Sequence, residues 1–91
     1  MSKNVHDFFA PTYGDARQRF LAAAAKSGAV VTKHIHPLKG PSGEELALDV
    51  AAFGPLDAKR VFVTMSATHG GEGFLGSAAQ VGWLTEGRYR D

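Results

Sequence analysis

His69 and Glu72 are the residues of this chain whose types and spacing best fit a chemical site. They lie in the run Ser-Ala-Thr-His-Gly-Gly-Glu-Gly-Phe-Leu-Gly, residues 66 to 76. An imidazole and a carboxylate three residues apart project to the same side of a turn or of the first turn of a helix. A tetrahedral zinc site accepts both donors, and a His₂Glu set leaves one position open for water. On spacing alone, a solvated or helix-capping pair is the competing interpretation.

The glycines around this pair support a second interpretation. Gly70, Gly71 and Gly73 allow a sharp turn that would let two metal ligands converge. Gly71 to Gly76 also spells G-x-G-x-x-G, the dinucleotide-binding pattern, after an expected strand and at the start of an expected helix. Against that interpretation, Glu72 would place a carboxylate where a helix N-terminus favours the negative charge of the ligand.

A second pair of histidines, His34 and His36, has the two-residue spacing that places both rings on one face of a strand. One of them would be available as a third metal ligand. The alternative is that both are half-exposed side chains near a hairpin turn.

The run 66 to 80 resembles the zinc-ligand segment of a bacterial family catalogued as domain of unknown function 2817, within the zinc carboxypeptidase-like superfamily. The resemblance extends back through residues 36–44, 54–60 and 7–13. It implies that His69 and Glu72 are the first two ligands of one catalytic zinc. It also implies a later histidine ligand, a general-base glutamate and substrate-binding arginines, none of which lies in these 91 residues. The family more often has a branched apolar residue where Gly71 stands, so the loop is expected to be more flexible here.

The elements that must position the pair follow from periodicity. Thr12 is an expected N-cap of a helix over 13–27, with Gly28 just after its end. Alternation over 29–36 and 45–53, around a turn rich in glycine and proline, predicts a β-hairpin. The apolar run at 60–65 predicts a strand buried on both faces. The stretch 74–86 predicts a helix that is apolar nearly all round and so lacks cover on one flank.

Composition limits the class of protein. The chain has 91 residues, so it forms one domain at most, which buries about 60 to 65% of the surface of its unfolded form. A net charge of +1 does not indicate a basic surface that would bind nucleic acid or an anionic membrane. The absence of cysteine excludes disulfides and thiolate metal sites, and no stretch has the roughly 20 apolar residues of a membrane span. A cytoplasmic protein is the expectation.

Together these observations predict an α/β fold in which residues 1–91 are the N-terminal part of a three-layer sandwich, a mixed sheet with flanking helices. The expected function, taken from the resemblance, is hydrolysis of a peptide or amide bond in a small substrate by a zinc-dependent enzyme. This chain, with an incomplete site for one zinc ion, is expected to be inactive alone. The alternatives are a small interaction module that associates through the apolar helix flank, and a dinucleotide-binding βα unit.

Overall fold

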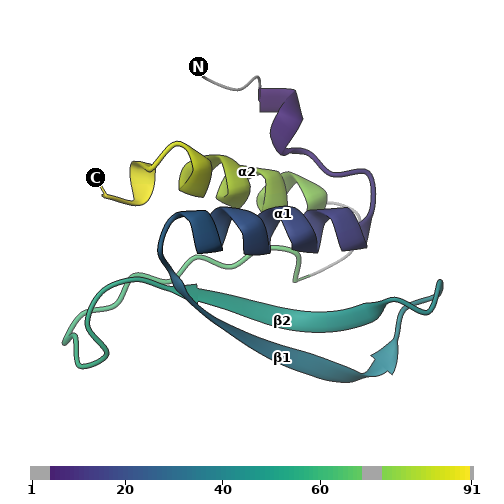
Figure 1. Ribbon diagram of the computed structural model, residues 1–91, viewed down its shortest axis with the longest axis horizontal. Helices are drawn as coiled ribbons and strands as arrows, with labels where there is room; N and C mark the ends of the chain where they lie inside the picture. The colour runs from purple at the N-terminus through teal and green to yellow at the C-terminus, as the bar shows by residue number, and fades with distance from the viewer. Residues whose placement is uncertain (1–4, 69–72, 91) are drawn as a thin grey trace.

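The computed structural model describes residues 5–68 and 73–90 and confirms the α/β class. It contains two α-helices, a two-stranded antiparallel sheet and two short 3₁₀ helices (Figure 1). In chain order these elements are η1 (Val5–Phe8), α1 (Tyr13–Lys26), β1 (Val30–Lys39), β2 (Glu45–Ala52), α2 (Gly73–Thr85) and η2 (Arg88–Arg90).

Helix α1 has the ends that the sequence predicts. The Thr12 hydroxyl accepts a hydrogen bond from the backbone N–H of Asp15 at 3.1 Å, as an N-cap does. After the last turn, Gly28 has a φ of +82°. The N–H of Gly28 donates to the carbonyl of Ala25, and the N–H of Ala29 donates to the carbonyl of Ala24. This pair of bonds is a Schellman motif, which stops the helix and turns the chain towards β1.

The predicted β-hairpin is also present. Strands β1 and β2 pair from Val30 opposite Ala52 to Ile35 opposite Ala47, with an irregularity before Lys39. The N–H of Gly40 donates to the carbonyl of Glu44, and Gly43, at φ +80°, closes the turn. Opposite residues share a face, so the residues on one face are Val31, Lys33, Ile35, Ala47, Asp49 and Ala51, and those on the other are Val30, Thr32, His34, Leu48, Val50 and Ala52.

The prediction of a strand at 60–65 is wrong for the described chain. The segment is drawn as an extended trace with no strand arrow between the hairpin and α2 (Figure 1). Within the described ranges, none of its backbone groups has a hydrogen bond to another backbone group. A strand requires a neighbour as well as suitable residues, and the apolar run of 60–65 has no neighbour to pair with here.

The small core lies where α1, α2 and η1 meet. Its buried hydrophobic residues are Phe8, Ala24, Ala78, Val81 and Leu84. Phe8 lies directly on Gly82, where an added Cβ would come within 2.9 Å of the Phe8 ring. At the C-terminal end of α1, the Ser27 hydroxyl donates a hydrogen bond to the carbonyl of Leu84 in α2 at 3.3 Å. These contacts hold the two helices side by side.

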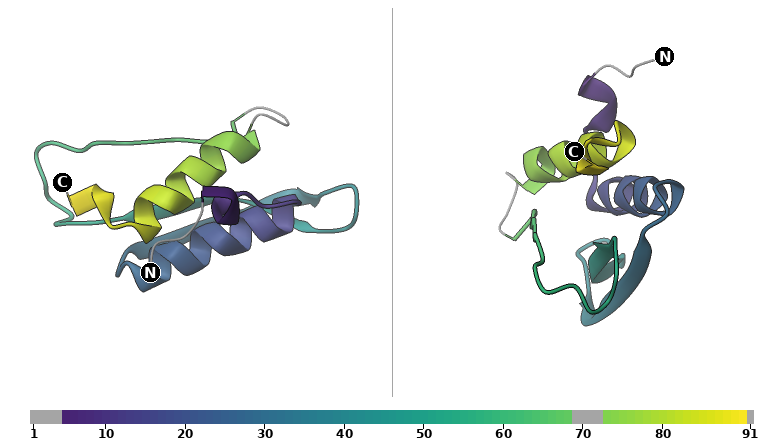
Figure 2. Two further views of the ribbon diagram at one scale, coloured as in Figure 1. Left: turned by 90° about the horizontal axis from the view of Figure 1, so that it is seen from above. Right: turned by 90° about the vertical axis from the view of Figure 1, so that its left-hand side faces the viewer.

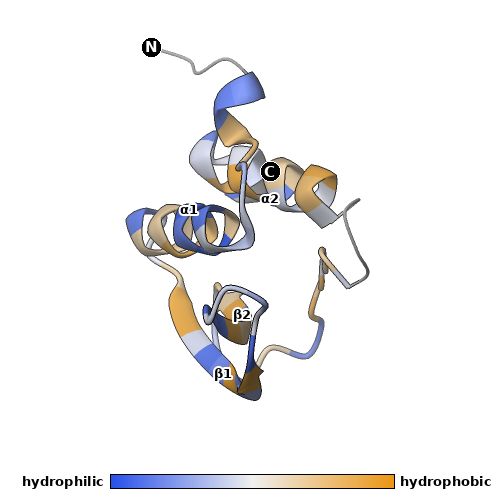
Figure 3. Ribbon diagram, turned by 90° about the vertical axis from the view of Figure 1, so that its right-hand side faces the viewer, coloured by the Kyte–Doolittle hydropathy of each residue, from blue (hydrophilic) through white to orange (hydrophobic). Residues whose placement is uncertain are grey.

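Both helices lie on the same side of the hairpin (Figure 2). Helix α1 is the one that contacts the strands, through the face that carries Ala47 and Asp49. The opposite face, with Leu48 and Val50, is exposed. Figure 3 shows hydrophobic residues along the hairpin and along the trace that leads to α2, as well as on α2 itself. Much of the apolar surface therefore lies outside the core.

Candidate functional site

The predicted metal ligands lie between two described ends of chain that contact each other. The segment before them ends at Ser66, Ala67 and Thr68, and the chain returns at Gly73, the first residue of α2. A Cβ added at Gly73 would lie 2.8 Å from the Cα of Ala67. Only a residue without a side chain allows this approach, so Gly73 has a packing role at the start of the helix.

Ala67 has an unusual backbone conformation. Its φ of +62° is the only positive value at a non-glycine position in the described chain. A left-handed alanine costs about 1 to 2 kcal/mol and persists where surrounding contacts impose it. Such residues cluster at functional sites. Ala67 stands two residues before His69, which makes this turn the most distinctive local feature near the predicted ligands.

Gln80 of α2 ties the extended segment to the helix. The Ser66 hydroxyl donates to Oε1 of Gln80 at 2.8 Å, and Nε2 of Gln80 donates to the Thr64 hydroxyl at 3.2 Å. One turn earlier in α2, a Cβ added at Gly76 would lie 2.9 Å from the Cβ of Ser66. The amide and the two glycines together fix the end of the segment against the first two turns of α2.

The ligand pair itself, His69 and Glu72, lies outside the described residues, as do Gly70 and Gly71. Their assignment as metal ligands therefore stays a prediction. In the parts of the chain that are described, no three His, Asp or Glu side chains are grouped closely enough to hold a metal ion. His34 and His36 are exposed on β1, and Nδ1 of His36 accepts a hydrogen bond from the N–H of Leu38 at 3.0 Å.

Comparison with known families gives one match. Residues 9–91 match the family described as "Protein of unknown function (DUF2817)". The chain belongs to this family. No curated protein and no solved structure shows significant similarity to this chain.

In this DUF2817 chain, no helix among the described residues is long and apolar enough to cross a membrane.

A charged cluster that sequence reasoning missed joins α1 to β2 of the DUF2817 chain. Arg17 donates to Asp49 at 2.8 and 3.1 Å and to Glu45 at 2.6 Å. The hydrogen bond from Arg17 lowers the pKa of Glu45, and the bonds to Asp49 and Glu45 raise the pKa of Arg17. Four residues earlier, the Tyr13 hydroxyl accepts from the N–H of Ala47 at 2.9 Å and contacts its carbonyl at 3.2 Å.

The spacing of this cluster was visible in the sequence. Tyr13 and Arg17 are four apart on a helix, and Glu45 and Asp49 are four apart on a strand, so each pair shares a face. The hydrogen bonds of Arg17 and Tyr13 to Glu45, Ala47 and Asp49 all run between α1 and β2, which indicates a structural role.

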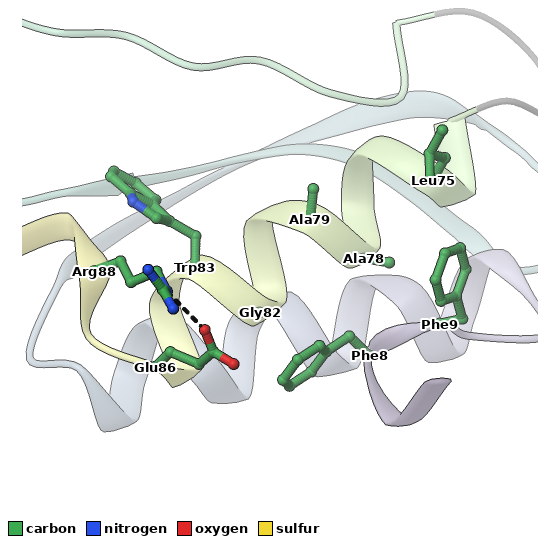
Figure 4. Close-up of a pocket in the computed structure, with 9 residues that line it drawn as sticks. All are labelled: Phe8, Phe9, Leu75, Ala78, Ala79, Gly82, Trp83, Glu86 and Arg88. Carbon is green, nitrogen blue, oxygen red and sulfur yellow. Dashed lines mark hydrogen bonds and ion pairs between the residues drawn. The ribbon is translucent and has the colours of Figure 1, made fainter. Parts of the chain in front are cut away.

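A groove of about 370 Å³ follows the outer face of α2. Figure 4 shows Phe8, Phe9 and Leu75 at one end and Trp83 at the other, beside an ion pair of 2.8 Å between Arg88 and Glu86. The remaining lining residues are Ala78, Ala79 and Gly82. The lining of the groove is mostly apolar, and its residues offer no set of convergent polar groups for catalysis.

Proposed function

We propose that this chain is the N-terminal part of a zinc-dependent hydrolase of the carboxypeptidase-like superfamily, with His69 and Glu72 as the first two metal ligands. The observation that supports the proposal best is the contact between Ala67 and Gly73. It brings the chain on either side of His69 and Glu72 together at the first turn of α2. The left-handed Ala67 and the bonds of Gln80 hold one side of that junction in place.

In this proposal, His69 supplies an imidazole nitrogen and Glu72 a carboxylate oxygen, while Gly70, Gly71 and Gly73 shape the turn. The chemistry that a zinc ion supplies when bound is a coordinated water with a pKa near about 7 and a polarised carbonyl. Two protein ligands do not define a tetrahedral site. The third ligand and the general base therefore come from residues outside this chain, and the chain alone is inactive.

The substrate class rests on the family resemblance. It is a small molecule with a peptide or amide bond, and it bears a carboxylate. A cytoplasmic location belongs to the same proposal, and the absence of cysteine is compatible with a reducing compartment.

Zinc affinity and stoichiometry test the ligand assignment. Equilibrium dialysis with metal analysis should give weak binding of at most one zinc per chain, because two protein ligands leave the site incomplete, and at least tenfold weaker binding in His69→Ala and in Glu72→Ala. His34→Ala is the matched control, because it removes an exposed histidine from β1 and should leave binding unchanged. A tenfold loss in His36→Ala would identify that residue as a third ligand. Binding that survives in both ligand variants would overturn the assignment, and no binding at all would confine it to a longer protein.

The second candidate is a small non-catalytic interaction module that associates through the flank of α2. The apolar groove along α2 supports it, with Leu75 65% exposed at one end. Self-association without zinc binding would favour this module over the hydrolase. The dinucleotide-binding unit is the weaker alternative, because Gly73 and Gly76 already serve close packing against Ala67 and Ser66.

A further inference from the structure

One face of α2 contacts the segment that precedes the predicted ligands. Gly73, Gly76 and Gln80 follow the spacing i, i+3, i+7, which places them in one line along the helix. The two glycines leave room for the chain at Ala67 and Ser66. Gln80 adds a polar side chain that bonds to the same segment. The face therefore combines two residues that admit the chain with one that holds it.

Packing holds the segment 61–67 only weakly. Its large hydrophobic side chains are mostly exposed: Val61 74%, Phe62 82%, Val63 68% and Met65 77%. Within the ranges that the structure describes, its backbone groups make no hydrogen bond to other backbone groups. The Gln80 amide, by contrast, accepts from the Ser66 hydroxyl at 2.8 Å and donates to the Thr64 hydroxyl at 3.2 Å. One side chain thus supplies the polar contacts between the segment and α2.

Ala67 requires such a hold. Its φ of +62° is a left-handed conformation, which alanine disfavours because its Cβ approaches the following carbonyl oxygen. The two hydrogen bonds of Gln80 offer a free energy of the same order as the cost of one left-handed residue. Ser66 directly precedes Ala67, so fixing the Ser66 side chain on α2 restricts the backbone conformation that Ala67 adopts.

We propose that Gln80 is a positioning residue, whose amide keeps Ala67 left-handed and so sets the direction in which the chain leaves Ala67 towards the predicted ligands. The consequence for metal binding rests on the proposed function, in which His69 and Glu72 bind zinc. A chain that is already held before the metal arrives loses less conformational entropy on binding it. The amide of Gln80 therefore raises zinc affinity through the backbone, without being a ligand itself.

NMR of the zinc-free chain tests the hold on Ala67. A left-handed residue brings its own N–H and Hα atoms closer together than a helical or extended residue does, so Ala67 should give a strong intraresidue cross-peak in a nuclear Overhauser spectrum. Gln80→Leu removes both hydrogen bonds and should abolish the excess intensity. Gln80→Glu should retain it, because both hydroxyls can donate to a carboxylate. Gln18→Leu is the matched control, the same change at an exposed position of α1.

The contrary results are as definite. An Ala67 cross-peak that stays strong in Gln80→Leu would overturn the proposal, as would its loss in Gln18→Leu. Loss in Gln80→Glu would assign the effect to packing of the side chain instead of its hydrogen bonds, and so contradict the role of the amide. If Gln80→Leu loses its helical circular dichroism, Ser66→Ala decides, because it removes one of the same bonds from the other end.

Zinc affinity separates this role from the ligand assignment. In equilibrium dialysis, Gln80→Leu should bind zinc about threefold more weakly than Gln18→Leu, or weaker still. Equal binding by these two variants, with the Ala67 cross-peak lost in Gln80→Leu, would show that the held backbone does not serve the metal. Absence of zinc binding in the parent chain concerns the ligand assignment alone, and the NMR result then decides the role of Gln80.

Discussion

Gly73 and Gly76 set how closely α2 approaches the segment before it. Side chains at these positions would meet Ala67 and Ser66 at 2.8 and 2.9 Å, distances that real Cβ atoms do not adopt. Neither contact is to the far end of a flexible side chain, so relief requires movement of the backbone. The backbone position of Ser66 and Ala67, just before the predicted ligands, therefore depends on glycine at positions 73 and 76 of α2.

Gly76→Ala should therefore destabilise the chain, although alanine favours helix. We expect a net loss of about 1 to 2 kcal/mol in the free energy of unfolding, because overpacking exceeds the gain in helix propensity. Urea denaturation followed by circular dichroism measures it. Gly14→Ala is the matched control, since nothing lies within 4 Å of its added Cβ, and it should stabilise by up to about 1 kcal/mol. Equal stabilisation by both changes would contradict the close contact.

Glu45 should give the chain part of its acid sensitivity. The hydrogen bond from Arg17 lowers the pKa of Glu45 in the folded chain. The unfolded chain then binds the proton more readily, so the stability due to Glu45 is present above its ordinary pKa of about 4.3 and is lost as the pH falls through the lower folded pKa. Glu45→Gln should be less stable than the parent at pH 7, with a difference that shrinks below about pH 4.

The partner of Glu45 provides the control for that measurement. In an Arg17→Gln background, Glu45→Gln should have little effect at any pH, because the group that lowers the pKa of Glu45 is gone. Urea denaturation at a series of pH values gives all four free energies of unfolding. A difference that is independent of pH would show that Glu45 acts through packing instead.

At the scale of elements, the sequence correctly predicts the helices and turns that depend on contacts between residues close together in the chain. The helix over 13–27 and the hairpin are confirmed because their signals, the Thr12 cap, Gly28 and the period-two alternation, act within a few residues. The strand at 60–65 was predicted wrongly because pairing depends on a partner remote in sequence. The link between Arg17 and Asp49, 32 residues apart, was missed for the same reason.

The same distinction, between residue types and contacts remote in sequence, determines how much of the candidate site the sequence predicts. Residue types alone indicate that His69 and Glu72 are suitable zinc donors, and the structure leaves that prediction untested because both lie outside the described residues. The contacts of Gly73 and Gly76 had no equivalent in the sequence pattern, which explained these glycines by flexibility or by a dinucleotide. Their role in close packing emerges only once Ala67 and Ser66 are placed beside the helix.

Tyr13 should protect the edge of β2. Tyr13→Phe removes the hydroxyl that pairs with the N–H and the carbonyl of Ala47. We expect a loss of about 1 to 2 kcal/mol in the free energy of unfolding, typical of a part-buried polar group left without its partner. Hydrogen exchange measured by NMR should show faster exchange at the Ala47 amide, while amides within α2 serve as the internal reference. Unchanged exchange at Ala47 would show that the tyrosine does not close this edge.

At the scale of the whole molecule, the surface that remains exposed should determine how the chain unfolds. The unfolded chain exposes about 14,100 Å², so a folded area of 7090 Å² corresponds to about half buried. The length of the chain predicts about 60 to 65%. The exposed face of the hairpin and the exposed segment 61–65 contribute to this shortfall.

The urea m-value reports this shortfall directly, because it scales with the surface exposed on unfolding. For this chain we expect a value about a fifth below that of ordinary domains of 91 residues. An ordinary m-value would mean that the chain covers more of its own apolar surface in solution than the structure shows.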